Sequence, residues 1–259
     1  MPFSQILVAF NSLIRKEITR FMRIWTQTLL PSAVTQTLYF LIFGTFIGSQ
    51  VDNIQGIKYM AFLVPGLIMM AVITNSFSNT VSSFFGAKFQ KNVEELIVSP
   101  TPNWVILAGY VAGGVLRGIL VGIIVFVISM IFNYQDIQIK YPIIVSLFVV
   151  LTAVAFSLGG FLNGLFARKF DDVAIVPTFV LTPLTYLAGI FYSIERLPQF
   201  WQAVSRANPI LYMVNGFRFG FYGVSDVNVW VSFGILMVLI VALSAVNMVL
   251  LNRGYGLKS

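Results

Sequence analysis

The residues that ordinarily carry catalysis and metal binding are scarce in this chain. It has no Cys and no His, and its nine Asp and Glu residues are scattered along the sequence. Thiolate or imidazole metal sites, Ser–His or Cys nucleophile pairs and disulfides all require residues that are missing. A phosphate-binding P-loop requires Gly-Lys-Ser/Thr, and the sequence contains no Gly-Lys dipeptide. We therefore predict a protein that is not an enzyme, with no catalytic residue, no metal and no cofactor bound by this chain.

The composition indicates an integral membrane protein. Of the 259 residues 58% are hydrophobic and 10% are charged, whereas roughly 25% are charged in ordinary soluble domains. The mean hydropathy is +0.89. The net charge of +7 is spread between hydrophobic blocks and forms no basic face, so no nucleic-acid partner is expected.

Six apolar blocks are long enough to cross a hydrocarbon core, which takes roughly 20 helical residues. We predict an all-α integral membrane protein with six transmembrane helices between residues 29 and 259. The predicted spans are Leu29–Gly48, Tyr59–Phe85, Trp104–Phe132, Pro142–Phe166, Val173–Tyr192 and Val229–Leu251.

The distribution of Lys and Arg predicts the orientation, because positively charged flanks resist translocation. With a cytoplasmic N-terminus, ten basic residues fall inside and five outside, and Arg117 lies within a span. Both termini are therefore predicted to be cytoplasmic. The inside set is Arg15, Lys16, Arg20, Arg23, Lys88, Lys91, Arg168, Lys169, Arg253 and Lys258.

Residues 1–28 are predicted to form an interfacial amphipathic helix. One arc carries Phe, Ile and Leu side chains and the opposite arc carries the basic residues. Glu17 is the exception, because it projects into the apolar arc. Its stem could reach back to Arg20 one turn on, or this part of the arc could dock on protein instead of lipid.

A short helix is predicted in the loop between the second and third spans, at about residues 92–99. Asn92 is predicted to be the N-cap, and Glu95 places a carboxylate at the third helical position. Pro100 ends the helix. Its apolar side chains favour a partner protein on the cytoplasmic side, and the alternative is that they rest on the bilayer. These apolar residues are Val93, Leu96, Ile97 and Val98.

The loop between the fifth and sixth spans, about residues 193–222, is predicted to form a re-entrant helical hairpin on the outer face. Its two helical segments are apolar, too short to span, and broken at Asn208-Pro209. Irregular backbone at membrane depth must be covered by protein or a cavity. We predict that this hairpin closes the bundle as an outer gate, anchored by Trp201, Tyr212 and Phe217.

Polar side chains recur at helical spacing in three of the predicted spans. Such residues tend to face a bundle interior or an aqueous path. We predict that they line a substrate path, with ordinary helix packing as the alternative. The path residues are Gln36, Tyr39, Asn75, Asn79, Thr178, Thr182 and Tyr186. Arg117 is expected to snorkel toward the interface from one to two turns inside the apolar core of its span, with a role in the path as the alternative.

Several segments, taken in order, resemble the permease subunits of ABC type-2 exporters. They are Phe89–Pro102, Leu197–Trp201, Asn208-Pro209, Gly216–Arg218 and the basic amphipathic N-terminus. The resemblance implies a homodimer in the bacterial inner membrane, seated on two cytoplasmic ABC ATPase subunits that bind ATP and Mg²⁺. It also implies export of a substrate that the sequence does not identify, with the short helix at 92–99 as the coupling element.

On this basis the ATPase contact is predicted at Asn92, Glu94, Glu95, Leu96 and Ile97. Other functions remain as alternatives. An ion- or proton-coupled transporter would need a titratable group in the membrane, and all nine acids map to loops or the interfacial helix. A membrane enzyme lacks a catalytic constellation, and a non-transporting membrane assembly factor is a further alternative. Abundant Phe and the uncharged polar stripes favour an amphipathic substrate such as a lipid, a lipid-linked glycan or a hydrophobic drug, over a small ion.

Overall fold

The computed structural model describes residues 2–51 and 53–256, with the side chain of Ile97 also outside the description. Within these residues the chain is helical and forms no strand. The α-helices are α1 (Phe3–Arg23), α2 (Trp25–Thr28), α3 (Leu30–Tyr39), α4 (Tyr59–Phe89), α5 (Asn92–Val98), α6 (Asn103–Asn133), α7 (Pro142–Phe166), α8 (Phe170–Val176), α9 (Thr182–Tyr186), α10 (Gln199–Arg206), α11 (Pro209–Tyr222) and α12 (Val229–Asn252). The π- and 3₁₀-helical segments are η1 (Phe40–Ile47), η2 (Gly48–Gln50), η3 (Pro177–Leu181) and η4 (Ile194–Arg196).

Five helical stretches in the described chain are long and apolar enough to cross a membrane. They correspond to five of the six predicted spans, and the all-helical membrane class is confirmed. Their bounds are Trp25–Gln50, Tyr59–Phe89, Asn103–Asn133, Pro142–Phe166 and Val229–Asn252.

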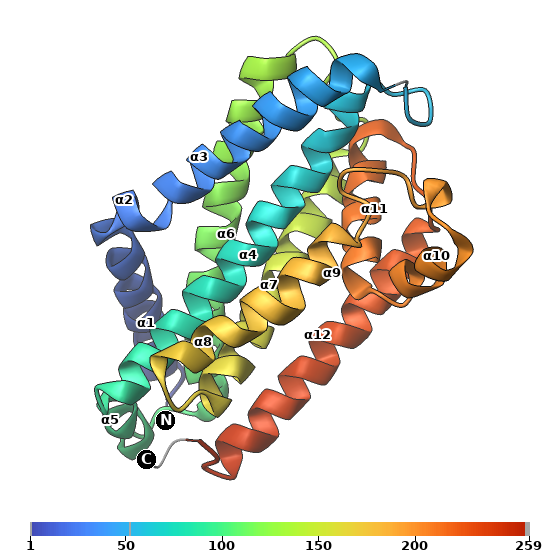
Figure 1. Ribbon diagram of the computed structural model, residues 1–259. Helices are drawn as coiled ribbons and strands as arrows, with labels where there is room; N and C mark the ends of the chain where they lie inside the picture. Colours follow the sequence, from blue (N-terminus) through green and yellow to red (C-terminus); the bar gives the residue numbers. More distant parts are fainter. Residues whose placement is uncertain (1, 52, 257–259) are drawn as a thin grey trace.

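The predicted fifth span is the one that does not meet this criterion. Its helical part consists of α8, η3 and α9, which contain 7, 5 and 5 residues. Pro177 and Pro183 lack the N–H that a continuous α-helix would use, and the segment between them is π-helical. The stretch nevertheless leaves the end of the bundle where α7 finishes and rises toward the other end, and α12 returns (Figure 1).

Helix α4 lies at the centre of the bundle and packs against both α6 and α7. Glycines permit the close approach, because a Cβ at Gly160 on α7 would lie 2.4 Å from the backbone oxygen of Phe77. On α6, a Cβ at Gly114 would lie 2.9 Å from the backbone oxygen of Ser76. Such close approach at small residues is typical of helix packing in membranes.

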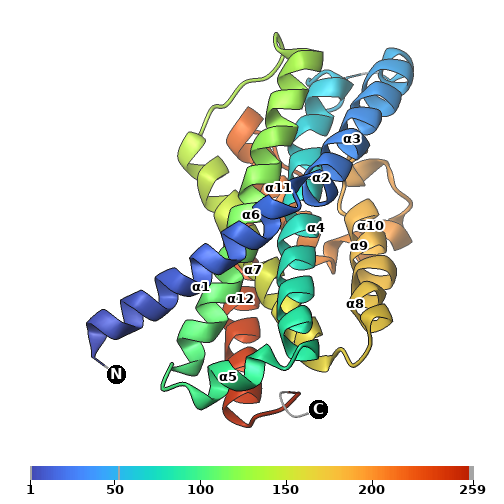
Figure 2. The same ribbon diagram turned by 90° about the vertical axis from the view of Figure 1, so that its left-hand side faces the viewer.

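The start of α1, the end of α12 and the short helix α5 all lie at one end of the bundle (Figures 1 and 2). Helix α1 crosses α6 obliquely (Figure 2). A Cβ at Gly109 would meet Leu13, and one at Gly113 would lie 2.6 Å from Cβ of Glu17. The predicted amphipathic helix thus packs on the bundle along part of its apolar arc, and it ends at Arg23.

The segment predicted as a re-entrant hairpin contains two helices that differ in burial. Helix α11 lies in the core against α7, α12 and α4. Helix α10 is short and largely exposed, with Ser205 as its buried residue. The break between them occurs at Asn208, whose side chain caps α11 by accepting from the N–H of Ile210 at 3.0 Å.

Candidate functional site

The short helix α5 is the first candidate element and forms where the sequence predicted it. Glu94 and Glu95 are exposed, and Val98 is 87% exposed. Val93 is buried in an apolar cluster with residues of α4 and α6, and Leu96 is partly buried against the same cluster, so these two residues hold the helix to its own chain. The other face of α5 points away from the bundle and is available to a partner.

The predicted cap of α5 is wrong. The N-cap residue is Lys91, with φ 62°, and no side chain caps the helix. Asn92 is already helical, and its amide nitrogen donates to Gln90 Oε1 at 3.2 Å. The left-handed turn at Lys91 redirects the chain sharply after α4, which moves the start of α5 by one residue. The predicted contact residue Ile97 has its side chain outside the described part.

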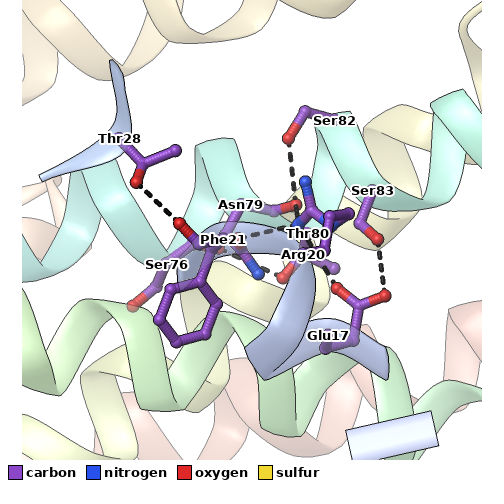
Figure 3. A network of polar contacts seen from close by, with 9 residues as sticks. All are labelled: Glu17, Arg20, Phe21, Thr28, Ser76, Asn79, Thr80, Ser82 and Ser83. Atoms are coloured by element: carbon purple, nitrogen blue, oxygen red, sulfur yellow. Dashed lines mark hydrogen bonds and ion pairs between the residues drawn. The ribbon is translucent and has the colours of Figure 1, made fainter. Parts of the chain in front are cut away.

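A network of charged and polar groups joins α1 to α4 (Figure 3). The Glu17 side chain is 1% exposed. One of its carboxylate oxygens accepts from Ser83 Oγ at 2.6 Å, and the other lies 3.3 Å from Arg20 Nη2. Both interpretations of Glu17 left open by the sequence therefore hold together: it pairs with Arg20, and its part of the arc docks on protein.

Arg20 extends the same network along α4. Its Nη2 donates to Asn79 Oδ1 at 2.8 Å and to the Asn79 backbone oxygen at 3.1 Å. A charged pair taken out of water needs such additional hydrogen bonds to offset the cost of desolvation. The pair therefore fixes the position of α1 on the bundle.

A second buried charge lies nearby, and the prediction that Arg117 snorkels is wrong. Its side chain is 9% exposed and donates to the backbone oxygen of Thr28 at 3.0 Å and to Asn75 Oδ1 at 3.1 Å. Asn75 also donates to Ser32 Oγ at 3.0 Å. Thr28 belongs to α2 and its carbonyl binds Arg117 directly, while Ser32 of α3 binds Asn75, so Arg117 finds partners inside the bundle and does not extend to the interface.

These contacts divide the predicted path residues into two groups. Asn75 and Asn79, both on α4, use their amides to hold Arg117 and Arg20. They therefore lie among α1, α3 and α6 in the interior of a single subunit.

The second group lies on the other side of α3. Tyr39 Oη and Tyr186 Oη are 3.1 Å apart, so the first span and α9 are side by side. Phe191 packs between them, with ring centroids 5.7 Å from Tyr39 and 5.8 Å from Tyr186. Thr178 and Thr182 are exposed on the same α8–α9 stretch.

Gln36 is 4% exposed, and its amide oxygen has no partner among the described groups. A buried unpaired amide oxygen is costly in an apolar surrounding.

The three predicted outer-gate residues occupy different environments. Phe217 is 2% exposed in the core, and Tyr212 donates its hydroxyl to the Arg206 backbone oxygen at 2.7 Å. Trp201 is 45% exposed and packs edge-on to Phe200. Phe217 and Tyr212 thus hold α11 in place, while Trp201 faces outward from this subunit.

Sequence reasoning missed a buried polar cluster beneath α10. Arg218 is completely buried, donates to the Gly189 backbone oxygen at 2.7 Å and lies 3.8 Å from the ring centroid of Phe62. Asp226 accepts from Ser193 Oγ at 3.1 Å, and its backbone N–H donates to Asn215 Oδ1 at 3.0 Å. The sequence offered one signal for this cluster, which is that Arg218 is a single charged residue inside the apolar run of α11.

An exposed carboxylate positions the start of the α8–α9 stretch. Asp172 accepts from the backbone N–H groups of Arg168 at 2.8 Å and Lys169 at 3.0 Å. These hydrogen bonds hold the pKa of Asp172 below its usual range. No cluster of three or more His, Cys, Asp or Glu suited to a metal ion occurs within 2–51 and 53–256.

The helical spans, the short helix at one end and the amphipathic helix docked beside it define a polytopic helical membrane protein. The ABC-2 type transporter family matches residues 8–222 of this chain. The chain is 58% identical to the Inner membrane transport permease YadH of Escherichia coli (strain K12) over 252 residues, which cover 97% of this chain and 98% of the relative. It is also 24% identical to Nodulation protein J of Rhizobium leguminosarum bv. viciae over 228 residues, 87% of each chain. The protein belongs to the ABC-2 type transporter family of transport permeases.

Proposed function

We propose that this chain is the membrane subunit of an ATP-driven exporter and that α5 transmits force from a separate cytoplasmic ATPase. The observation that carries the proposal is α5 itself, a short helix at the end of the bundle with two exposed carboxylates and an exposed Val98. Family membership supports a partner that hydrolyses ATP, and the absence of a Gly-Lys dipeptide agrees with a separate subunit. In this proposal both termini and α5 lie in the cytoplasm.

The direct test is co-purification of the chain with its ATPase. The double variant Glu95→Lys, Leu96→Asp should detach the ATPase or abolish substrate-stimulated ATP hydrolysis. Glu195→Lys is the matched control, because it reverses an exposed charge outside α5. Normal complex yield and turnover in the double variant would refute the coupling role of α5.

We propose a homodimer in which the first span and the α8–α9 stretch face the second copy. The first span exposes Leu30, Val34, Leu38 and Leu41 at 40–52%, with spacing that puts them on one side of the helix. Tyr39 and Tyr186 join this side to α9, and η3, which directly precedes α9, continues the apolar surface with Phe179 at 74% exposure. A large apolar surface of this kind suits a protein contact as well as lipid.

The dimer can be tested with introduced cysteines, since the chain has none. Leu38→Cys should give a disulfide-linked dimer on oxidation in membranes. Val241→Cys, equally apolar and 62% exposed on α12, should not. Equal cross-linking of both variants would contradict the assigned face.

Six crossings, with α8–α9 as the fifth, follow from the same proposal. The path would run between the two copies along Gln36, Tyr39, Thr178, Thr182 and Tyr186. The aromatic cluster of Tyr39, Tyr186 and Phe191 with its two hydroxyls suits an amphipathic substrate that offers both apolar surface and hydrogen-bonding groups.

The outer gate is proposed at α10 and α11, with Trp201 as the exposed element. A Cys at Gln199, which is exposed, should react with a bulky impermeant thiol reagent differently in nucleotide-free and ATP-trapped complexes. Equal labelling would argue against gating.

Transport driven by a proton gradient is the competing mechanism. Among the described residues, Glu17 is the one acidic residue that is buried, and it is paired with Arg20. Substrate export from vesicles that contain the chain without the ATPase would favour this mechanism over ours.

A further inference from the structure

A groove of about 340 Å³ lies on the flank of the bundle, between α6, α7 and α11. Phe217 and Phe221 of α11 line it together with Ile68 of α4, and Ile123 and Val150 stand on its two sides. Ile123 is 54% exposed and Val150 is 41% exposed, so the groove opens outward. Within a membrane the medium at this opening is lipid.

The lining of the groove matches a hydrocarbon chain. The remaining residues are branched aliphatic side chains, Phe126, Gly122 and Ser146. The Ser146 hydroxyl already donates to the Pro142 backbone oxygen at 3.0 Å. The groove therefore offers contact area to methylene groups and little hydrogen bonding.

A polar recess of about 460 Å³ lies on the other side of a shared backbone wall. The wall is formed where Lys140 N–H donates to the Phe221 oxygen at 3.0 Å and Tyr141 N–H donates to the Gly220 oxygen at 2.8 Å. Ile139 and Phe221 line the groove, whereas their neighbours Lys140 and Tyr222 line the recess. The two cavities are thus adjacent parts of one surface.

The depth of this region corresponds to a headgroup level. The loop from α6 to α7 runs down the side of α6, so α7 begins below the end of α6 (Figure 2). Tyr141 in this loop stacks on Phe219 at 5.3 Å between ring centroids and is 46% exposed. Exposed Tyr side chains beside apolar spans are typical of the membrane–water interface.

The recess carries an excess of positive charge. Its Lys58 lies 2.9 Å from Asp136, which neutralises both. Lys140 is exposed, and within the described chain its ammonium group forms no ion pair. Gln135 and Gln138 add amide groups to the same recess. An anion at Lys140 would be favoured both by charge and by these donors.

We propose that the groove and recess together bind one resident anionic phospholipid, with an acyl chain between α6 and α7 and the headgroup phosphate at Lys140. Gln36, Tyr39 and Tyr186 of the proposed path line neither cavity. The site therefore goes beyond the proposed transport function, because its lipid stays bound and is not carried across.

The test uses full-length protein in detergent, with native mass spectrometry and thermal unfolding to follow lipid binding. Added phosphatidylglycerol should be retained as one bound copy and should raise the unfolding temperature more than phosphatidylcholine of the same chains. Lys140→Ala should weaken phosphatidylglycerol binding about fivefold, which corresponds to roughly 1 kcal/mol for one Lys at a lipid headgroup. Arg196→Ala removes another exposed basic residue, outside both cavities, and should leave binding unchanged.

A second variant tests the groove. Val150→Trp should fill the space for the acyl chain and abolish the bound copy, whereas Val241→Trp on the exposed face of α12 should not. Unaltered phosphatidylglycerol retention in Val150→Trp would overturn the groove assignment. Equal affinity for both lipids, or no effect of Lys140→Ala, would overturn the headgroup assignment.

Discussion

The ion pair between Glu17 and Arg20 makes an asymmetric prediction about stability. Glu17 has a side chain 1% exposed, and Arg20 has one 29% exposed. Replacing Arg20 by Met leaves a buried carboxylate with Ser83 as its remaining hydrogen-bond donor. Leaving a buried charge unpaired typically costs about 3–5 kcal/mol.

Removing the other partner should cost less. In Glu17→Gln the size of the side chain is kept, and Arg20 retains water and its two hydrogen bonds to Asn79. The loss is then that of a hydrogen bond to a charged group, about 1.5–3 kcal/mol. In the double variant no charge remains unpaired, so its cost should be smaller than the sum of the two single costs.

The assay is thermal unfolding of the purified permease in one detergent. For a chain of this size 1 kcal/mol shifts the unfolding temperature by about 2–4 °C, so Arg20→Met should lower it by about 6–20 °C. Arg23→Met is the matched control, because Arg23 is exposed on the same helix and should change little. The reasoning is refuted if Glu17→Gln destabilises as much as Arg20→Met, or if the two effects are additive.

Three further outcomes follow from the packing and the charges. Gly160→Ala should destabilise by about 1–3 kcal/mol or more in the same thermal assay, because its Cβ would lie 2.4 Å from a backbone oxygen, whereas Gly234→Ala meets nothing within 4 Å and should be neutral. Arg117→Met should lower the unfolding temperature less than Arg20→Met, since it removes the charge and leaves neutral acceptors unpaired; an equal or larger loss would contradict this. Asp172→Asn should destabilise at neutral pH relative to an Asp171→Asn control, and a pH series should show the difference vanish as pH falls below 3.8, because the native pKa of Asp172 is depressed and its contribution exists only while it is ionised.

Hydropathy and length predicted the spans well where the helix is continuous. The fourth predicted span, Pro142–Phe166, has the bounds of α7, since Pro142 can begin a helix without losing a hydrogen bond. The fifth span stays a prediction, because its helical part is the short consecutive run of α8, η3 and α9, with 7, 5 and 5 residues. Mean hydropathy does not register where such a run stops being helical.

The partners of the polar residues could not be predicted, because they depend on the register between helices. Asn75 and Asn79 lie four residues apart, and the sequence treats them as one stripe. In the structure they hold Arg117 and Arg20, which come from two different helices. If Arg117 or Arg20 stood one turn further along its helix, its partner on α4 would differ, and the hydropathy pattern of the sequence would be the same.

The hydrogen bond between Ser83 of α4 and Glu17 of α1 connects the proposed ATPase contact with the docked amphipathic helix. Helix α4 carries Ser83 two turns before its end at Phe89, and α5 begins at Asn92. Ser83 is bonded to Glu17 of α1, so a displacement of α5 that moves the end of α4 must either carry α1 along or break this contact. Breaking it would remove one of the two hydrogen-bond donors to the buried Glu17 carboxylate, with Arg20 as the other, and moving α1 requires Leu13 to shift against Gly109. Losing a hydrogen bond to a charged group costs about 1.5–3 kcal/mol. We therefore expect α1 and the end of α4 to move as one body during ATP hydrolysis, and a disulfide joining positions 17 and 83 should leave ATPase-coupled transport intact.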